Sequence, residues 1–221
     1  MTRPDLDAAH RQAWDAIGRP GTWWTGLQRV DLARTAVAAM TSADPLPPWV
    51  APSSVDGWLP ARPAAPSAAH DAMYRVAAHA GTLTERWYRA VTDALGDLAY
   101  VEIVGLACTV AAVVSFRRSA GLEPWVLPSP VDGEPSGEVP DDLVATPLNW
   151  VRVTAAPEPR PAVVQAFTSV PAEDRRLWTL AAAQYIPNLE MVDPSWSRGT
   201  LTRPQMEVVA TRVAQLRECF Y

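Results

Sequence analysis

The distribution of proline is the feature that most constrains how this chain can fold. Two stretches, residues 44–66 and 123–147, gather Pro, Gly, Ser and Asp without regular apolar spacing, so we expect long surface connections there. Other segments are rich in Ala, Leu and Arg and carry no Pro beyond the first turn, which favours helices. We predict helices over residues 6–17, 25–40, 68–80, 85–95, 99–120, 161–168, 172–183 and 203–221.

Strand signals are scarce. Residues 151–154 alternate in polarity, but the run is short and lies beside a connection, so we expect at most a marginal strand. The predicted fold class is therefore all-α. The proline-rich stretch suggests an N-terminal helical half over 1–122, a linker over 123–147 and a C-terminal helical half over 148–221.

Composition excludes several classes of function. The 221 residues are 48% apolar with a formal net charge of −5, as in an ordinary soluble globular protein, and no basic stripe points to nucleic acid. The N-terminus is polar, and the longest uncharged run, residues 103–116, is too short to cross a bilayer and suits a buried helix. Cys108 and Cys219 do not resemble a secreted disulfide framework. We expect a cytoplasmic protein without nucleic-acid or membrane partners.

The last segment carries the clearest local pattern. Thr202 and Gln205 form a capping box around Pro204, which predicts a helix start. An apolar stripe comes next and is expected to pack against the rest of the protein; it consists of Met206, Val209, Val213, Leu216 and Phe220. No C-capping Gly or terminating Pro is present after it, and the sequence runs through Cys219 to two aromatic residues.

Glu207 lies twelve positions before Cys219. On one straight helix the two residues would be separated by roughly 18 Å along the axis and about 120° around it. They can meet only if the chain bends between them.

This segment, Glu207-Val-Val-Ala-Thr-Arg-Val-Ala-Gln-Leu-Arg-Glu-Cys219-Phe-Tyr221, resembles the alkylhydroperoxidase D and carboxymuconolactone decarboxylase family, and within it an alkylhydroperoxidase-related branch that includes selenoproteins. Family members carry Glu, eleven residues, Cys-x-x-Cys and then His at the fourth position after the second Cys. Softer similarity covers 83–88, 100–105 and 173–178. The resemblance implies an alkylhydroperoxidase-like helical bundle.

The resemblance also implies a peroxide-reducing thiol or selenol oxidoreductase, an antioxidant enzyme. Cys219 would be the resolving thiol and Glu207 a proton-relay carboxylate, while the second Cys or selenocysteine would fall at position 222 and the His at 226. A selenocysteine codon translated as a stop would produce the 221-residue form, which we expect to be inactive. The implied partners are a small peroxide, a thiol reductant and further copies of the chain, commonly as trimers or hexamers. No cofactor is implied.

The chain also shows a weak internal similarity between its two halves. Residues 101–108 align with 206–213, each after a Trp-containing helix, so Glu102 takes the place of Glu207. Val114 stands where Cys219 would be, so the first half would lack a redox cysteine. Duplication and chance similarity both stay open.

Other candidate residues favour structural roles. Cys108 lies in an uncharged run and is expected to be buried and inert. The histidines show no ligand spacing, so we expect surface or linker positions for them and no metal site; they are His10, His70 and His79. A Glu in a first helical turn also stabilises the helix without chemistry, which leaves a second hypothesis: a non-catalytic scaffold or ligand-binding protein with a degenerate redox site. A lactone decarboxylase ranks last, because no basic and histidine pocket is recognisable.

Overall fold

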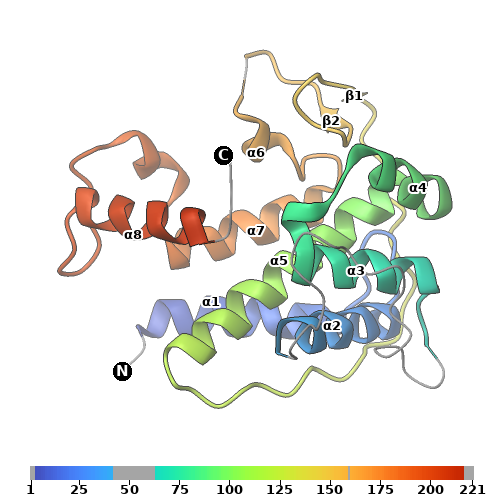
Figure 1. Cartoon of the computed structure of the whole chain (residues 1–221), viewed down its shortest axis with the longest axis horizontal. Helices are drawn as coiled ribbons and strands as arrows, with labels where there is room; N and C mark the ends of the chain where they lie inside the picture. Colours follow the sequence, from blue (N-terminus) through green and yellow to red (C-terminus); the bar gives the residue numbers. More distant parts are fainter. Residues whose placement is uncertain (1–2, 42–62, 159, 217–221) are drawn as a thin grey trace.

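The computed structural model describes residues 3–41, 63–158 and 160–216. The prediction of an all-α fold is confirmed: the described chain is mostly helical, with one two-stranded sheet of two residues per strand (Figure 1). The elements in chain order are α1 (Pro4–Asp15), η1 (Ala16–Gly18), α2 (Gly26–Thr41), α3 (Ser67–His79), η2 (Ala80–Thr82), α4 (Glu85–Leu95), α5 (Asp97–Ser119), β1 (Leu143–Val144), β2 (Val153–Thr154), α6 (Ala162–Gln165), α7 (Pro171–Gln184), η3 (Asn188–Val192) and α8 (Arg203–Leu216).

Local sequence signals explain the central helices. Thr84 caps α4 by accepting a hydrogen bond from the Trp87 amide at 3.2 Å. Gly96, with φ of +86°, then turns the chain directly into α5, a backbone conformation that a side chain would strain. The predicted C-cap at Gly121 is present with φ of +64°, and the Leu122 amide closes the turn onto the Arg117 carbonyl at 2.9 Å.

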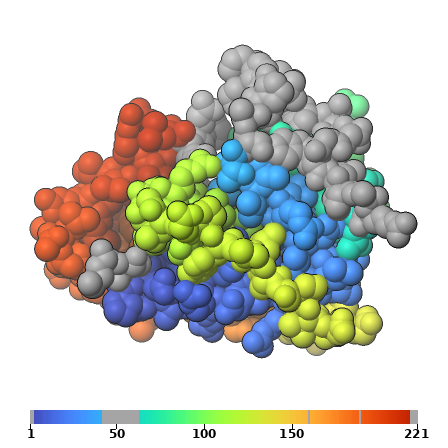
Figure 2. Space-filling model, turned by 90° about the horizontal axis from the view of Figure 1, so that it is seen from below, coloured from blue at the N-terminus to red at the C-terminus, as the bar shows by residue number. Residues whose placement is uncertain are grey.

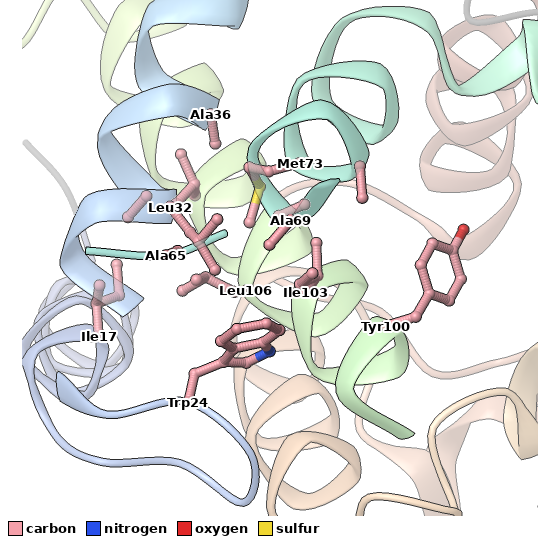
Figure 3. Close-up of a cluster of buried hydrophobic side chains, with 14 of the residues drawn as sticks. Ile17, Trp24, Leu32, Ala36, Ala65, Ala69, Met73, Tyr100, Ile103 and Leu106 are labelled. Atoms are coloured by element: carbon pink, nitrogen blue, oxygen red, sulfur yellow. The ribbon is translucent and has the colours of Figure 1, made fainter. Parts of the chain in front are cut away.

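Helix α5 is the centre of the molecule. It is long and apolar enough to cross a membrane by length and composition, but 67% of its most apolar window is buried against the rest of the protein. Helices α2 and α3 pack on it, and Trp24 donates its indole N–H to the Ala99 carbonyl at 3.0 Å. Figure 3 shows the resulting core, in which Leu32, Met73 and Ile103 meet with no exposed surface. Burial of this apolar surface is the main contribution to stability.

The stretch 123–147 is held on the N-terminal helices by backbone hydrogen bonds. The amides of Val131 and Ser136 donate to the carbonyls of Gly18 and Gly21 at 2.7 and 3.1 Å, and the Trp14 indole donates to the Val126 carbonyl at 2.8 Å. In Figure 2 the yellow part of this stretch lies beside the blue N-terminal helices. The predicted surface connection is thus packed along the N-terminal helices. It contains β1, which pairs antiparallel with β2, the predicted marginal strand.

Helix α8 begins as the capping box predicts, with the Thr202 amide donating to Gln205 Oε1 at 2.9 Å. The expected packing of its apolar stripe is wrong for the described residues. Met206 is 9% exposed, but Val209, Val213 and Leu216 are 57%, 54% and 64% exposed. The half-buried positions further along α8 are Ala210 and Ala214, so a different face of the helix is the more buried one. Figure 1 shows α8 projecting at one side of the molecule, beyond α7.

Candidate functional site

Glu207 lies in the first turn of α8, where two side chains hold its carboxylate. The Tyr185 hydroxyl, from the C-terminal end of α7, donates to Oε2 at 2.7 Å, and Arg203 Nε donates to Oε1 at 2.5 Å. These two bonds lower the pKa of Glu207, the Tyr185 bond most. Burial and the neighbouring carboxylate together raise the pKa of Tyr185 to about 12. The pair is therefore a carboxylate and a neutral phenol.

Arg203 also fixes the chain that precedes α8. Its Nη1 and Nη2 donate to the carbonyls of Asp193 and Met191 at 3.2 and 3.0 Å. Arg203 is 15% exposed at its side chain and Glu207 44%, so the network is open to solvent on the carboxylate side. A hydrogen-bonded carboxylate with an accessible face can accept and return protons.

Cys219 lies outside the described residues, so the structure does not bring it together with Glu207. The predicted pairing of the two residues stays a prediction. Sequence reasoning missed Tyr185 and Arg203. The spacing of Arg203 and Glu207 by one helical turn was a usable signal, whereas the approach of Tyr185 depends on how α7 and α8 cross.

A second cluster of charges is fully buried between three helices. Arg29 of α2 pairs through Nη1 with Glu102 of α5 and, at 2.9 Å, with Glu173 of α7, which also pairs with Arg176. The Trp23 amide donates to Glu102 Oε2 at 2.6 Å. Each charge in this cluster faces an opposite charge, which offsets part of the cost of burying ions, although Nε and Nη2 of Arg29 have no hydrogen-bond partner among the described residues.

The pKa values of the two carboxylates of the cluster are shifted in opposite directions. Burial raises the pKa of Glu102 despite the Arg29 charge. At Glu173 burial acts in the same sense, but Arg29 and Arg176 together outweigh it and lower the pKa. Glu102, which the internal similarity aligns with Glu207, thus belongs to a buried ion pair. This environment indicates a structural role for Glu102.

The buried cluster also bears on the division into halves. Arg29 and Glu102 belong to residues 1–122, while Glu173 belongs to residues 148–221, and the ion pairs tie these segments together. Helix α7 packs against α1 and α5. The domain boundaries at 122 and 148 stay predictions, and the segments on either side of them share one interior.

The expected surface positions of the histidines are wrong. His10, His70 and His79 are 1%, 0% and 5% exposed, because each packs among helices. His70 contacts Asp31 Oδ2 at 3.1 Å and Thr35 Oγ1 at 2.7 Å. This Asp–His–Thr order resembles a hydrolytic triad, but Thr35 is 1% exposed, so substrate has no path to its hydroxyl.

Asp31 has a structural task instead. Its Oδ2 accepts the backbone amides of Ala64 and Ala65 at 2.7 and 3.3 Å, which fastens the start of α3 to α2. Among the described residues, no group of three or more His, Cys, Asp or Glu side chains is arranged to hold a metal ion.

Cys108 is partly buried on the wall of a cavity formed with α4 and the chain before β2. Burial raises the pKa of its thiol to about 11, so the thiol is protonated at neutral pH and a poor nucleophile.

Comparisons with protein-family models, with curated proteins and with solved structures found no match to this chain.

Proposed function

We propose that this chain is a peroxide-reducing thiol or selenol oxidoreductase of the alkylhydroperoxidase-like type, with Cys219 as the resolving thiol and Glu207 as the proton relay. The observation that carries the proposal is the Tyr185–Glu207–Arg203 network at the start of α8. It provides an ionised, hydrogen-bonded and accessible carboxylate twelve residues before the cysteine, where the family motif has its Glu. The protein would act in the cytoplasm on a small organic or inorganic peroxide.

The chemistry needs two chalcogens. The attacking thiolate or selenolate, at position 222 by the resemblance, takes the terminal peroxide oxygen, the O–O bond breaks and the alcohol leaves with a proton. The Cys219 thiolate then attacks the oxidised atom, a sulfur–sulfur or sulfur–selenium bond forms and water leaves. An external dithiol reduces that bond and restores both groups.

Both steps move protons, and here Glu207 has its role. Ionisation of the attacking group releases a proton that the leaving alkoxide later takes up. Glu207, whose pKa is lowered, holds that proton only transiently, and Tyr185 can pass or reorient it through the 2.7 Å hydrogen bond. Arg203 keeps the carboxylate aimed while this occurs.

One experiment tests the proposal at the level of the gene. The nucleotides after the Tyr221 codon are read: an in-frame TGA or Cys codon, with His four codons later, is expected. Any other residue at position 222 contradicts the assignment of the pair.

A kinetic experiment tests the role of Glu207 in the protein extended by its own downstream codons. Reduction of cumene hydroperoxide with a dithiol donor is measured for the parent and for Glu207→Gln, which should lose about 10²–10⁴-fold in kcat/KM. Glu85→Gln is the matched control, since Glu85 also lies in a first helical turn and pairs with Arg89 at 3.0 Å. Equal rates for Glu207→Gln and the control would remove Glu207 from the mechanism. The 221-residue form is expected to be inactive in the same assay.

The second candidate function is a non-catalytic helical scaffold. The exposed valines of α8 favour it, since they suit assembly whether or not a redox site is present. Absence of peroxidase activity in the extended protein, together with a stable oligomer, would decide for the scaffold. Under both functions we propose that the chain forms homo-oligomers.

A further inference from the structure

A cavity of about 360 Å³ opens between α4, α5, the chain just before β2 and the residues after α6. Its size falls within the range of about 300–1,000 Å³ that small-molecule sites occupy. In Figure 1 α4 and the two strands lie on the side of the molecule away from α8, and none of Tyr185, Arg203 and Glu207 lines the cavity. The cavity is thus separate from the Glu207 network, and binding of a ligand in it is independent of the proposed function.

Aromatic rings form much of the wall. Tyr88 and Tyr100 meet edge to face with ring centroids 5.4 Å apart, and Trp150 lies against Tyr88 at 5.8 Å with the ring planes tilted by 33°. Phe167 forms another part of the wall. Rings in such orientations present both faces and edges to an inserted planar molecule, which is how proteins bind aromatic ligands.

The lining is uncharged. It contains no Asp, Glu, Lys, Arg or His among the described residues. Arg152 and Asp97 lie nearby but outside the lining, and they pair with each other at 2.6 Å. Burial raises the pKa values of Tyr88 and Cys108, so these groups are neutral at physiological pH. A charged ligand would lose its hydration here without gaining a counter-ion, which is costly.

Polar groups in the wall lack partners. Asn149 Nδ2 is buried and has no hydrogen-bond partner among the described residues, although it lines the cavity. The hydroxyls of Tyr88 and Tyr100 likewise make no hydrogen bond within the described part of the chain. A buried donor without an acceptor is costly in a folded protein, and a ligand oxygen would satisfy it.

We infer that this cavity is a binding site for a small, uncharged aromatic molecule that carries a hydrogen-bond acceptor, with the rings of Tyr88, Tyr100 and Trp150 around its plane and the Asn149 amide on its acceptor. The Cys108 thiol forms part of the wall and contacts the ligand without reacting with it.

The first test uses a matched pair of fluorescent probes. N-phenyl-1-naphthylamine is uncharged and aromatic, and 8-anilino-1-naphthalenesulfonate adds a sulfonate to the same skeleton. The neutral probe should bind with one-to-one stoichiometry and about tenfold or more tighter than the sulfonate. No saturable binding of the neutral probe, or equal affinity for both probes, overturns the inference.

Two substitutions locate the site. Val104→Trp places an indole in the cavity and should weaken binding of the neutral probe about tenfold or more. Val114→Trp is the control, because Val114 is a partly buried valine on the same helix that lines a different cavity, with Trp14 and Trp125. Ala166→Trp fills the first cavity from another element and replaces Val104→Trp should that variant not fold. Equal binding to the filled and control proteins contradicts the site.

Two further measurements test the contacts. 2-Acetylnaphthalene, which carries a carbonyl acceptor, should displace the neutral probe. Asn149→Leu should weaken the binding of 2-acetylnaphthalene about five- to tenfold and leave the binding of 2-ethylnaphthalene, which has no acceptor, unchanged. In the 221-residue form with Cys219→Ser, Cys108 is the remaining cysteine, and bound ligand should slow its labelling by N-ethylmaleimide. Unchanged labelling at saturating ligand would exclude Cys108 from the binding wall.

Discussion

The Tyr185 hydroxyl and the Glu207 carboxylate, 22 residues apart, are joined by a hydrogen bond of 2.7 Å that connects the end of α7 to the first turn of α8. Between them the chain makes a long excursion through η3, and Arg203 secures it by donating to backbone carbonyls. The position of the catalytic candidate is therefore set by tertiary contacts in the first turn of α8, while the apolar stripe further along that helix is exposed.

Removal of the phenol should be visible in the titration of Glu207. The Tyr185 hydrogen bond is the largest cause of the lowered pKa, so Tyr185→Phe should raise the pKa of this carboxyl toward its ordinary value. Because the folded pKa is depressed, the contribution of Glu207 to stability is present above the unfolded pKa and is lost as pH falls through the folded one. Carbon-13 NMR titration of the Glu207 carboxyl measures the change. Tyr88→Phe, on another helix, should leave it unchanged.

Arg29 should be among the most sensitive positions for stability. Arg29→Met leaves the carboxylates of Glu102 and Glu173 buried without their shared cation, which costs about 3–5 kcal/mol in the free energy of unfolding. Arg34→Met is the control, because Arg34 is largely exposed and its ion pair with Asp31 contributes about 0–1 kcal/mol. Urea unfolding at pH 7 measures both.

Acid should partly rescue the Arg29→Met variant. Without the guanidinium, nothing opposes the burial that already raises the pKa of Glu102, whereas Glu173 keeps its pairing with Arg176. Protonation of Glu102 therefore favours folding, and the penalty grows as pH rises toward its folded pKa. The gap between variant and parent should be smaller at about pH 5 than at about pH 7. A gap that is independent of pH would show that lost packing, and not buried charge, causes the destabilisation.

Gly21 should not tolerate a side chain. A Cβ there would lie 1.8 Å from Glu102 Oε1 and 2.6 Å from Arg29 Nη1, so Gly21→Ala must displace the buried ion cluster, at about 1–3 kcal/mol. Gly81→Ala is the matched control, since a Cβ at Gly81 meets nothing within 4 Å. Thermal unfolding compares the two, and an equal midpoint temperature for both variants would contradict the close packing at Gly21.

His10 should make the fold sensitive to mild acid. Burial lowers its pKa below the ordinary 6.5, so its contribution to stability is present above the unfolded pKa and is lost as pH falls through the folded one. Urea midpoints between about pH 7.5 and pH 5.5 measure this loss of stability, which should be smaller in His10→Leu than in the parent. The exposed neighbour Gln12, changed to Leu, should keep the parent slope.

The sequence predicted what depends on neighbours along the chain. The bounds of α4, the Gly121 C-cap and the Thr202–Gln205 capping box are all decided within a few residues, and all are present. It did not predict the Arg29–Glu102–Glu173 cluster, whose members are 73 and 144 positions apart and meet only when three helices pack. The burial of the histidines was missed for the same reason, since the groups that surround them come from distant segments, such as Phe116 against His10 and Asp31 against His70.

The apolar stripe of α8 shows the opposite error. Its helical spacing is correct, but Val209 and Val213 do not pack within the described chain, so a second subunit should cover them. The double variant Val209→Glu/Val213→Glu should shift the protein to a smaller species in light scattering coupled to size exclusion. Val163→Glu, at an exposed valine of α6, should keep the parent mass. A monomeric parent would contradict the homo-oligomer. The apolar stripe can stabilise an assembly only by being buried between subunits, and in a monomer the valines would stay exposed to solvent.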